Sequence, residues 1–169
     1  MGERIDASEW VRMTVRGLIL DPNSDAPVVI LREVEGTVFL PIWIGAFEAN
    51  AIAMAVEGVE IHRPMTHDLL HHSILQLGGK LERVEIHDLV AGTFYARLLV
   101  ATATGTIDID ARPSDAIALA VRAEAPIWAS RGVLQAAVST SRAADESDEE
   151  RLREWLANAQ PEDLGKYSM

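Results

Sequence analysis

Two short segments carry residue types that could bind or hydrolyse a phosphate ester. In the first, His67 and Asp68 follow Thr66 at the start of a predicted helix. An imidazole and a carboxylate at a helix start can share a metal ion or a phosphate, because the helix dipole favours an anion there. His71 lies four residues after His67, which places both on one helix face at a usable metal spacing. The structural alternative is that Thr66 caps the helix, Asp68 complements the dipole and His67 is a hydrogen-bonded core residue.

The second segment, Arg112-Pro113-Ser114-Asp115, opens another predicted helix. Proline suits a first helical residue, Ser114 can cap the helix, and Asp115 is favourable near the positive end of the dipole. Arg112 is then free to hold a carboxylate or a phosphate with its planar guanidinium group, unless it forms an internal ion pair with Asp115. Asp88, in a predicted turn, is a further candidate metal ligand, although aspartate is also a common turn residue.

An internal repeat decides which of these residues could meet. Residues 51–56 (Ala-Ile-Ala-Met-Ala-Val) return as residues 116–121 (Ala-Ile-Ala-Leu-Ala-Val). Two copies are too few for a solenoid, so we expect one domain built from two similar halves. Glu48 occupies the strand–helix junction of the first half that matches the junction of Arg112 in the second. If the junctions meet across a pseudo-twofold axis, one cleft contains two carboxylates and two arginines: Glu48, Asp68, Arg63 and Arg112.

The hydrophobic pattern predicts the elements that position these residues. Strands are predicted over residues 10–20, 28–31, 37–44, 81–86, 93–102, 106–111 and 125–129. Helices are predicted over residues 48–56, from 66 to the glycine pair 78–79, and over 113–123, while 131–138 is ambiguous. Strands before helices, twice, predict an α+β fold with a mixed or antiparallel sheet, helices packed on one face, and a C-terminal helix. We expect a domain over 1–138, a linker over 139–147, and an amphipathic helix and tail over 148–169.

Composition narrows the classes of function. A formal charge of −11 provides no general attraction for nucleic acid, because that attraction comes from Lys and Arg displacing counterions. Phosphate chemistry would therefore need a local arginine cluster or metal ions. The lack of cysteine excludes a thiolate nucleophile and a cysteine-based zinc site. The N-terminus does not resemble a signal peptide and no apolar run could span a membrane, so we expect a soluble, cytoplasmic protein without a membrane partner.

Four motifs in order resemble the bifunctional nuclease domain family. They are Leu-Pro-Ile-Trp-Ile-Gly (40–45) with Glu48 and Ala49, Arg-Pro-Met-Thr-His-Asp-Leu (63–69), Gly-Thr-Phe-Tyr-Ala (92–96), and residues 110–120. The likeness covers residues 10 to 138. It implies a duplicated α/β domain that is usually an oligomer, most simply a homodimer. Plant members of the family are described as degrading both DNA and RNA, so nucleic acid is the implied partner.

The resemblance also implies roles for individual residues. Acid–base or catalytic roles fall to four of them: Glu48, His67, Asp68 and Asp115. Arg63 and Arg112 would contact the phosphate, and Asp68 with Asp88 would bind a metal ion. The implied reaction is metal-assisted phosphodiester hydrolysis, in which magnesium or manganese suits carboxylate ligands. Two alternatives stay open. One is a non-catalytic regulatory or ligand-binding domain whose Arg63 and Arg112 hold a small anionic ligand or an acidic protein partner; the other is an oligomeric scaffold whose motifs cap helices.

Overall fold

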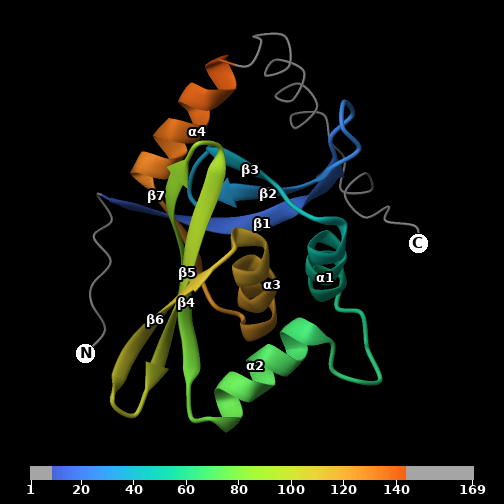
Figure 1. The fold of residues 1–169 in the computed structure, drawn as a ribbon, viewed down its shortest axis with the longest axis vertical. Helices are drawn as coiled ribbons and strands as arrows, with labels where there is room; N and C mark the ends of the chain where they lie inside the picture. Colours follow the sequence, from blue (N-terminus) through green and yellow to red (C-terminus); the bar gives the residue numbers. More distant parts are fainter. Residues whose placement is uncertain (1–8, 144–169) are drawn as a thin grey trace.

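The computed structural model describes residues 9–143 of the chain, and within them seven strands and four helices (Figure 1). In chain order these are β1 (Trp10–Leu20), β2 (Pro27–Glu33), β3 (Phe39–Trp43), α1 (Ala46–Val56), α2 (Thr66–Gln76), β4 (Lys80–Val90), β5 (Thr93–Thr102), β6 (Gly105–Ala111), α3 (Pro113–Ala123), β7 (Ile127–Ser130) and α4 (Arg131–Ala143). The predicted α+β class is confirmed.

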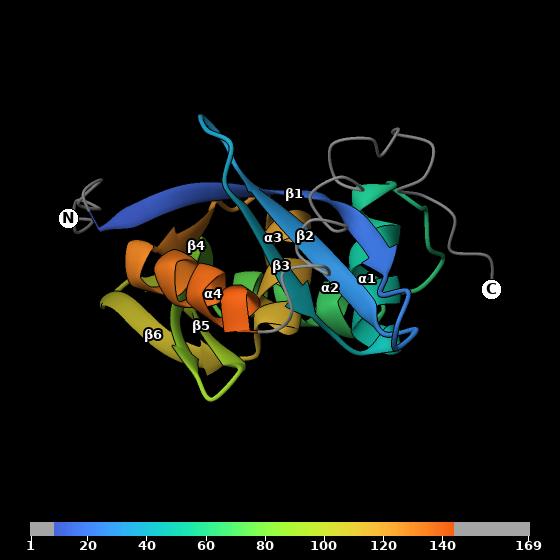
Figure 2. The same cartoon turned by 90° about the horizontal axis from the view of Figure 1, so that it is seen from above.

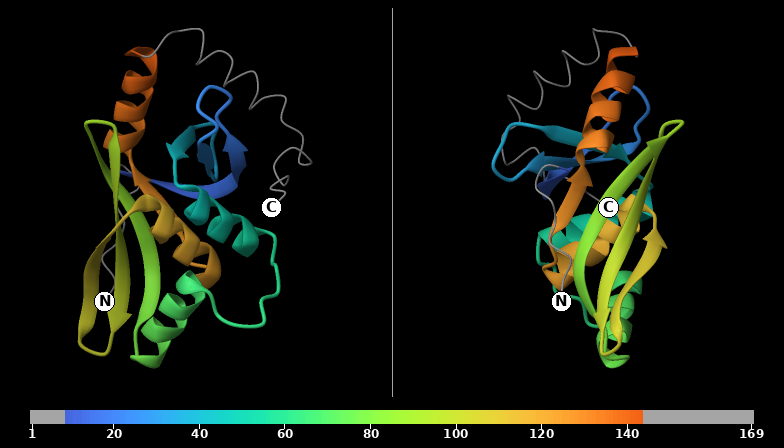
Figure 3. Two further views of the ribbon diagram at one scale, coloured as in Figure 1. Left: turned by 45° about the vertical axis from the view of Figure 1, so that its right-hand side comes forward. Right: turned by 90° about the vertical axis from the view of Figure 1, so that its left-hand side faces the viewer.

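The strands form one mixed sheet in the order β3-β2-β1-β7-β4-β5-β6. Every pairing is antiparallel except that between β4 and β7, which is parallel. The two halves of the repeat therefore have the same plan, since each is a three-stranded meander followed by a helix, α1 or α3. β7 lies between them, and the strands of the two meanders run nearly crosswise (Figure 3). The sheet order is thus close to twofold symmetric about β7.

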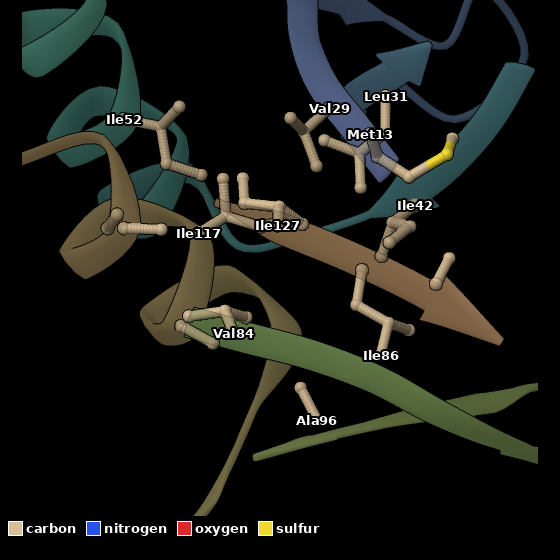
Figure 4. Packing of buried hydrophobic residues seen from close by; sticks show 14 of the residues in the cluster. Met13, Val29, Leu31, Ile42, Ile52, Val84, Ile86, Ala96, Ile117 and Ile127 are labelled. Carbon is tan, nitrogen blue, oxygen red and sulfur yellow. The ribbon is translucent and has the colours of Figure 1, made fainter. Parts of the chain in front are cut away.

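One hydrophobic core joins both halves to the helices. Alternate strand residues point into it, as Val11 and Met13 do on β1, while Arg12 between them is exposed. Ile52 of α1 and Ile117 of α3 meet the apolar side chains of both meanders and of β7 (Figure 4). The alanines of α1 and α3 are small enough to let these helices approach each other and the sheet closely. Seen from above, α3 and α4 lie between β1 and the β5–β6 hairpin (Figure 2).

Several boundaries differ from the prediction. β4 continues to Val90, so the turn is only Ala91 and Gly92, both with positive φ. Asp88 consequently lies in a strand, opposite Tyr95, and not in the predicted turn. The ambiguous segment 131–138 is helical and α4 extends to Ala143, which overlaps the start of the predicted linker. The rest of that linker and the predicted helix and tail over 148–169 lie outside the described residues. None of the helices within residues 9–143 is long and apolar enough to cross a membrane.

Candidate functional site

Three helices each place an acidic residue third in their first turn: Glu48 in α1, Asp68 in α2 and Asp115 in α3. A carboxylate there is stabilised by the positive end of the helix dipole. α1 packs on α3, and α3 also packs on α2. Because α3 lies between the other two helices, its polar side chains can reach both.

Arg112 connects the two halves of the repeat. It immediately precedes α3, and its Nη2 donates to Glu48 Oε1 at 2.9 Å while its Nε donates to Asp115 Oδ2 at 2.8 Å. The predicted meeting of the two strand–helix junctions is therefore observed for Glu48 and Arg112. The internal Arg112–Asp115 ion pair, which was the structural alternative, is present as well. Both carboxylates hold the guanidinium at once.

Asp115 is shared with a histidine of the third helix. His67 Nε2 lies 2.9 Å from Asp115 Oδ1, so the two oxygens of this carboxylate serve two different partners. An ionised carboxylate can only accept hydrogen bonds, so the Nε2 of a neutral His67 carries the proton and its Nδ1 has the free lone pair. Glu48, Arg112, Asp115 and His67 thus form one polar chain, which we call the junction cluster.

The carboxyl of Asp115 is held in its ionised form. Burial raises its pKa, but the hydrogen bonds from His67 and Arg112 and the charge of Arg112 outweigh burial and hold the pKa below its usual value. The hydrogen bonds that Arg112 donates, first to Asp115 and then to Glu48, raise the pKa of Arg112 above its usual value. The cluster therefore keeps a negative carboxylate beside an imidazole and a positive guanidinium, which are the components of an acid–base centre with a phosphate contact.

Asp68, a predicted catalytic and metal-binding residue, lies in a different ion pair. Its Oδ1 accepts from Arg122 Nε at 2.7 Å, and its Oδ2 accepts from the backbone N–H of Met65 at 2.9 Å. The capping position is Met65, so Thr66 is the first helical residue and not the predicted cap. Arg122 also donates to the carbonyl of Ala118, and its side chain is almost fully buried. This ion pair anchors the start of α2 on α3 and thereby positions the neighbouring His67.

The prediction from sequence did not include Arg122. A basic residue in the last turn of a helix is adequately explained by the dipole, as in α3. Its pairing with Asp68 depends on how α2 packs against α3, which the repeat does not indicate because α2 has no counterpart in the second half. One indication was present in the sequence: Arg122 follows Ala118 by four residues and so lies on the same face of α3, where a charged side chain needs a partner.

Other predicted residues make none of the polar contacts of the cluster. Arg63 is exposed in the loop between α1 and α2 and forms no ion pair with a described residue. His71 stacks on His72, with ring centroids 6.2 Å apart, and does not join His67. Asp88 lies near the turn end of β4, whereas α2 precedes the other end of that strand (Figure 1). The structure therefore does not bring Asp68 and Asp88 together.

The described residues, as arranged, offer no grouped donor set for the predicted magnesium or manganese ion. Within the described residues, no three His, Cys, Asp or Glu side chains are grouped so that they could hold a metal ion. The carboxylates of the junction cluster are bonded to Arg112 and His67, and that of Asp68 is bonded to Arg122. As arranged, these residues do not fit a bound divalent ion, and we derive no chemical step through one.

Two cavities lie at the C-terminal ends of α1 and α3 and include no residue of the junction cluster. A groove of about 630 Å³ is lined by β1, β2, the ends of α1 and α3 and residues 124–127, with Arg12 and Arg32 among them. A smaller pocket of about 280 Å³ is lined by the end of α1, the following loop and the Asp68–Arg122 pair. Ala55 and Val121 line both cavities, so they adjoin. The junction cluster itself lies on an open surface, where the Arg112 side chain is 65% exposed.

Comparisons with known proteins identify the family of the chain. The model of the Bifunctional nuclease domain matches residues 29–141. An uncharacterized protein of Mycobacterium tuberculosis (strain H37Rv) is 41% identical over 161 residues, which cover 89% of this chain and 95% of that protein. Bifunctional nuclease 1 of Arabidopsis thaliana is 30% identical over 60% of this chain and 32% of its own length. Bifunctional nuclease 2 of Oryza sativa subsp. japonica is 29% identical over 70% and 38%, respectively. The matched part is thus a little over a third of each plant protein or less.

Proposed function

This chain belongs to the bifunctional nuclease domain family, and we propose that it hydrolyses phosphodiester bonds of DNA, RNA or both at the junction cluster. The observation that carries the proposal is the shared carboxylate of Asp115, which holds an imidazole on one oxygen and a guanidinium on the other. The plant relatives named as nucleases support the substrate class, although the chain matches only part of their length.

In the proposed mechanism His67 is the acid–base group. Asp115 fixes the tautomer in which Nδ1 has the lone pair, so Nδ1 accepts a proton from an attacking water or from the 2′-hydroxyl of RNA. The negative charge of Asp115 stabilises the imidazolium that forms, and the imidazolium then returns the proton to the leaving oxygen. His67 is mostly buried, with 12% of its side chain exposed, which limits the orientations of its ring.

Arg112 contacts the phosphate in this proposal. Its two ion pairs leave further N–H groups on an exposed guanidinium, which can bind a phosphate oxygen and counter the charge that develops on it. Glu48 holds the far side of the guanidinium, and Asp68 with Arg122 orients α2. Arg63, exposed on the neighbouring loop, is proposed as a contact to an adjacent phosphate. These local arginines have to overcome the overall charge of −11, so binding would weaken steeply with salt.

The test is cleavage by the purified protein of single- and double-stranded DNA and RNA, with magnesium, with manganese and with chelator. We expect His67→Ala and Arg112→Ala to abolish cleavage. Two matched controls, His72→Ala on the same helix and Arg16→Ala on β1, should retain it, because both residues are exposed and lie outside the cluster. Cleavage that survives both cluster substitutions would contradict the proposal.

A second candidate function is the binding of a small anionic ligand without catalysis. The groove of about 630 Å³ supports it, because two arginines line it beside Glu33 and Glu124. Neither of them, Arg12 or Arg32, forms an ion pair with a described residue, so both are available to an anion. Thermal stabilisation by anionic metabolites that is lost in Arg32→Ala but kept in Arg112→Ala would assign the function to this groove.

We also propose that the chain forms a homodimer in the cytoplasm. α2 contributes no buried residue to the fold, and large apolar side chains are exposed on it and after it, including Leu69 and Leu77. Monomeric proteins seldom expose contiguous apolar surface, so a second copy covering this helix supports the predicted assembly.

A further inference from the structure

We infer that the guanidinium of Arg112 takes the place of a divalent cation between the two carboxylates of the junction cluster. It lies 2.9 Å from Glu48 Oε1 and 2.8 Å from Asp115 Oδ2, so it is the one positive group that bridges them in the described part of the chain. The inference deepens the proposed function and rests on it for its catalytic meaning. Its consequence is that cleavage needs no metal ion bound by these side chains.

The bonds already made leave too few oxygens for a metal ion. One oxygen of each carboxylate is bonded to Arg112, and the second oxygen of Asp115 is bonded to His67. Magnesium and manganese favour about six oxygen or nitrogen ligands in octahedral geometry. An ion could coordinate Glu48 and Asp115 together only by displacing the arginine, at the cost of two charge-assisted hydrogen bonds.

Exposure and charge both protect the arginine in this position. The Arg112 side chain is 65% exposed, whereas Glu48 is 19% and Asp115 31% exposed. The guanidinium therefore covers the carboxylates on the solvent side, and an incoming cation meets a like charge first. A guanidinium on an open surface can also counter the charge of a phosphate, which is what a bound ion would do in a metal-dependent nuclease.

Removal of the arginine should convert the cluster into a metal site. Glu48 and Asp115 would then offer the two carboxylates that Arg112 now bridges, and water would complete the ligand shell of a manganese ion. The test is titration with Mn²⁺, followed by the loss of the electron paramagnetic resonance signal of the free ion, for the wild-type protein, Arg112→Met, Arg112→Lys and the double variant Arg112→Met/Glu48→Gln. Arg112→Gln serves in place of Arg112→Met if circular dichroism shows that the methionine variant does not fold.

We expect Arg112→Met to bind one more Mn²⁺ per chain than the wild-type protein, and the double variant to lose it. Arg112→Lys keeps the positive charge and should bind like the wild type. Comparison with the double variant removes the contribution of weak sites elsewhere on this acidic surface. One Mn²⁺ bound by the wild type and abolished by Glu48→Gln would overturn the inference. A folded Arg112→Met or Arg112→Gln protein that binds no more Mn²⁺ than the wild type would also overturn it.

The binding measurement is independent of cleavage. If the protein shows the expected Mn²⁺ pattern but cleaves no nucleic acid, the inference stands and the proposed function is wrong. If the protein is a nuclease whose wild-type cluster binds Mn²⁺ through Glu48, the proposed function stands and the inference is wrong.

Discussion

The guanidinium of Arg112 lies 2.9 Å from the carboxylate of Glu48, although the two residues are 64 positions apart in the chain. Each belongs to the strand–helix junction of a different half of the repeat, so one ion pair connects the halves. Three residues after Arg112, in the first turn of α3, Asp115 connects this pair to His67 of α2. The candidate site therefore depends on the relative position of three helices, and the substitutions below test that dependence.

Asp115→Asn should reduce cleavage by about a hundredfold or more, because an amide can neither fix the His67 tautomer through the same bond nor stabilise the imidazolium. Single-turnover rates measured across a pH range would check this, and the pH profile should change with the rate. Asp110→Asn, an exposed position on β6, is the control and should leave both unchanged. If the pH profile of Asp115→Asn is unchanged, His67 is not the acid–base group.

Asp68→Asn should destabilise the fold in a pH-dependent way. Burial raises the pKa of Asp68, but the hydrogen bonds from Arg122 and from the Met65 N–H outweigh it and lower the pKa below 3.8. A carboxyl whose pKa is lowered on folding contributes stability that is complete above its unfolded pKa and is lost as the pH falls through the folded pKa. Urea unfolding should show a loss of about 2 kcal/mol at pH 7. The difference from wild type should shrink below about pH 4; a difference independent of pH would show that the charge of Asp68 is unimportant.

Gly45→Ala should weaken the link between the halves. An added Cβ would occupy the position of the Glu48 carboxylate, which lies directly against Gly45. Because that carboxylate is the end of a flexible side chain, we expect the free energy of unfolding to change by less than about 1 kcal/mol. The expected effect is on substrate binding, as a rise in KM with little change in kcat, since Arg112 loses one of its two supports. Gly132→Ala, where an added Cβ meets no close atom, is the matched control.

Leu69→Glu should shift the protein from dimer to monomer in sedimentation velocity experiments. α2 has no buried residue, and a charge at this exposed apolar position would be costly only if another chain covered it. Val90→Glu changes a similarly exposed residue at the β4–β5 turn, at the opposite end of β4 from α2 (Figure 1), and should leave the dimer intact. If the wild-type protein sediments as a monomer, the proposed homodimer is wrong.

The fold was predictable wherever local patterns agree with packing. The bounds of β5 and α3 match the prediction, because alternating apolar residues and the Gly92 and Pro113 boundaries mark them clearly. Asp88 misled the prediction of β4, since aspartate favours turns, whereas Leu89 and Val90 continue the ladder opposite Phe94 and Thr93. The end of β4 is set by its pairing with β5, which the sequence of β4 alone does not indicate.

The candidate site was predictable in part. The repeat predicted that Glu48 and Arg112 would meet, because equivalent junctions face each other across a pseudo-twofold axis. The partners of His67 and Asp68 were not predicted, because they depend on the angle at which α2 packs on α3, and α2 lies outside the repeat. Arg63 lies in the exposed loop before α2 and forms no ion pair with a described residue, so its contact with phosphate stays a prediction.

Counted from the first residue of each helix, Gly45 before α1 has the position that Arg112 has before α3. If the two halves were identical, either two arginines or two glycines would lie at the pseudo-twofold axis. Neither arrangement would place one cation between two carboxylates. Two halves in a single polypeptide can differ in sequence. One half therefore provides the guanidinium of Arg112, and the other has a glycine that leaves room for the Glu48 carboxylate. Gly45 has a hydrogen where other residues carry a side chain, and the Glu48 carboxylate lies in the space that this leaves. The two halves, otherwise similar, therefore differ most at this position.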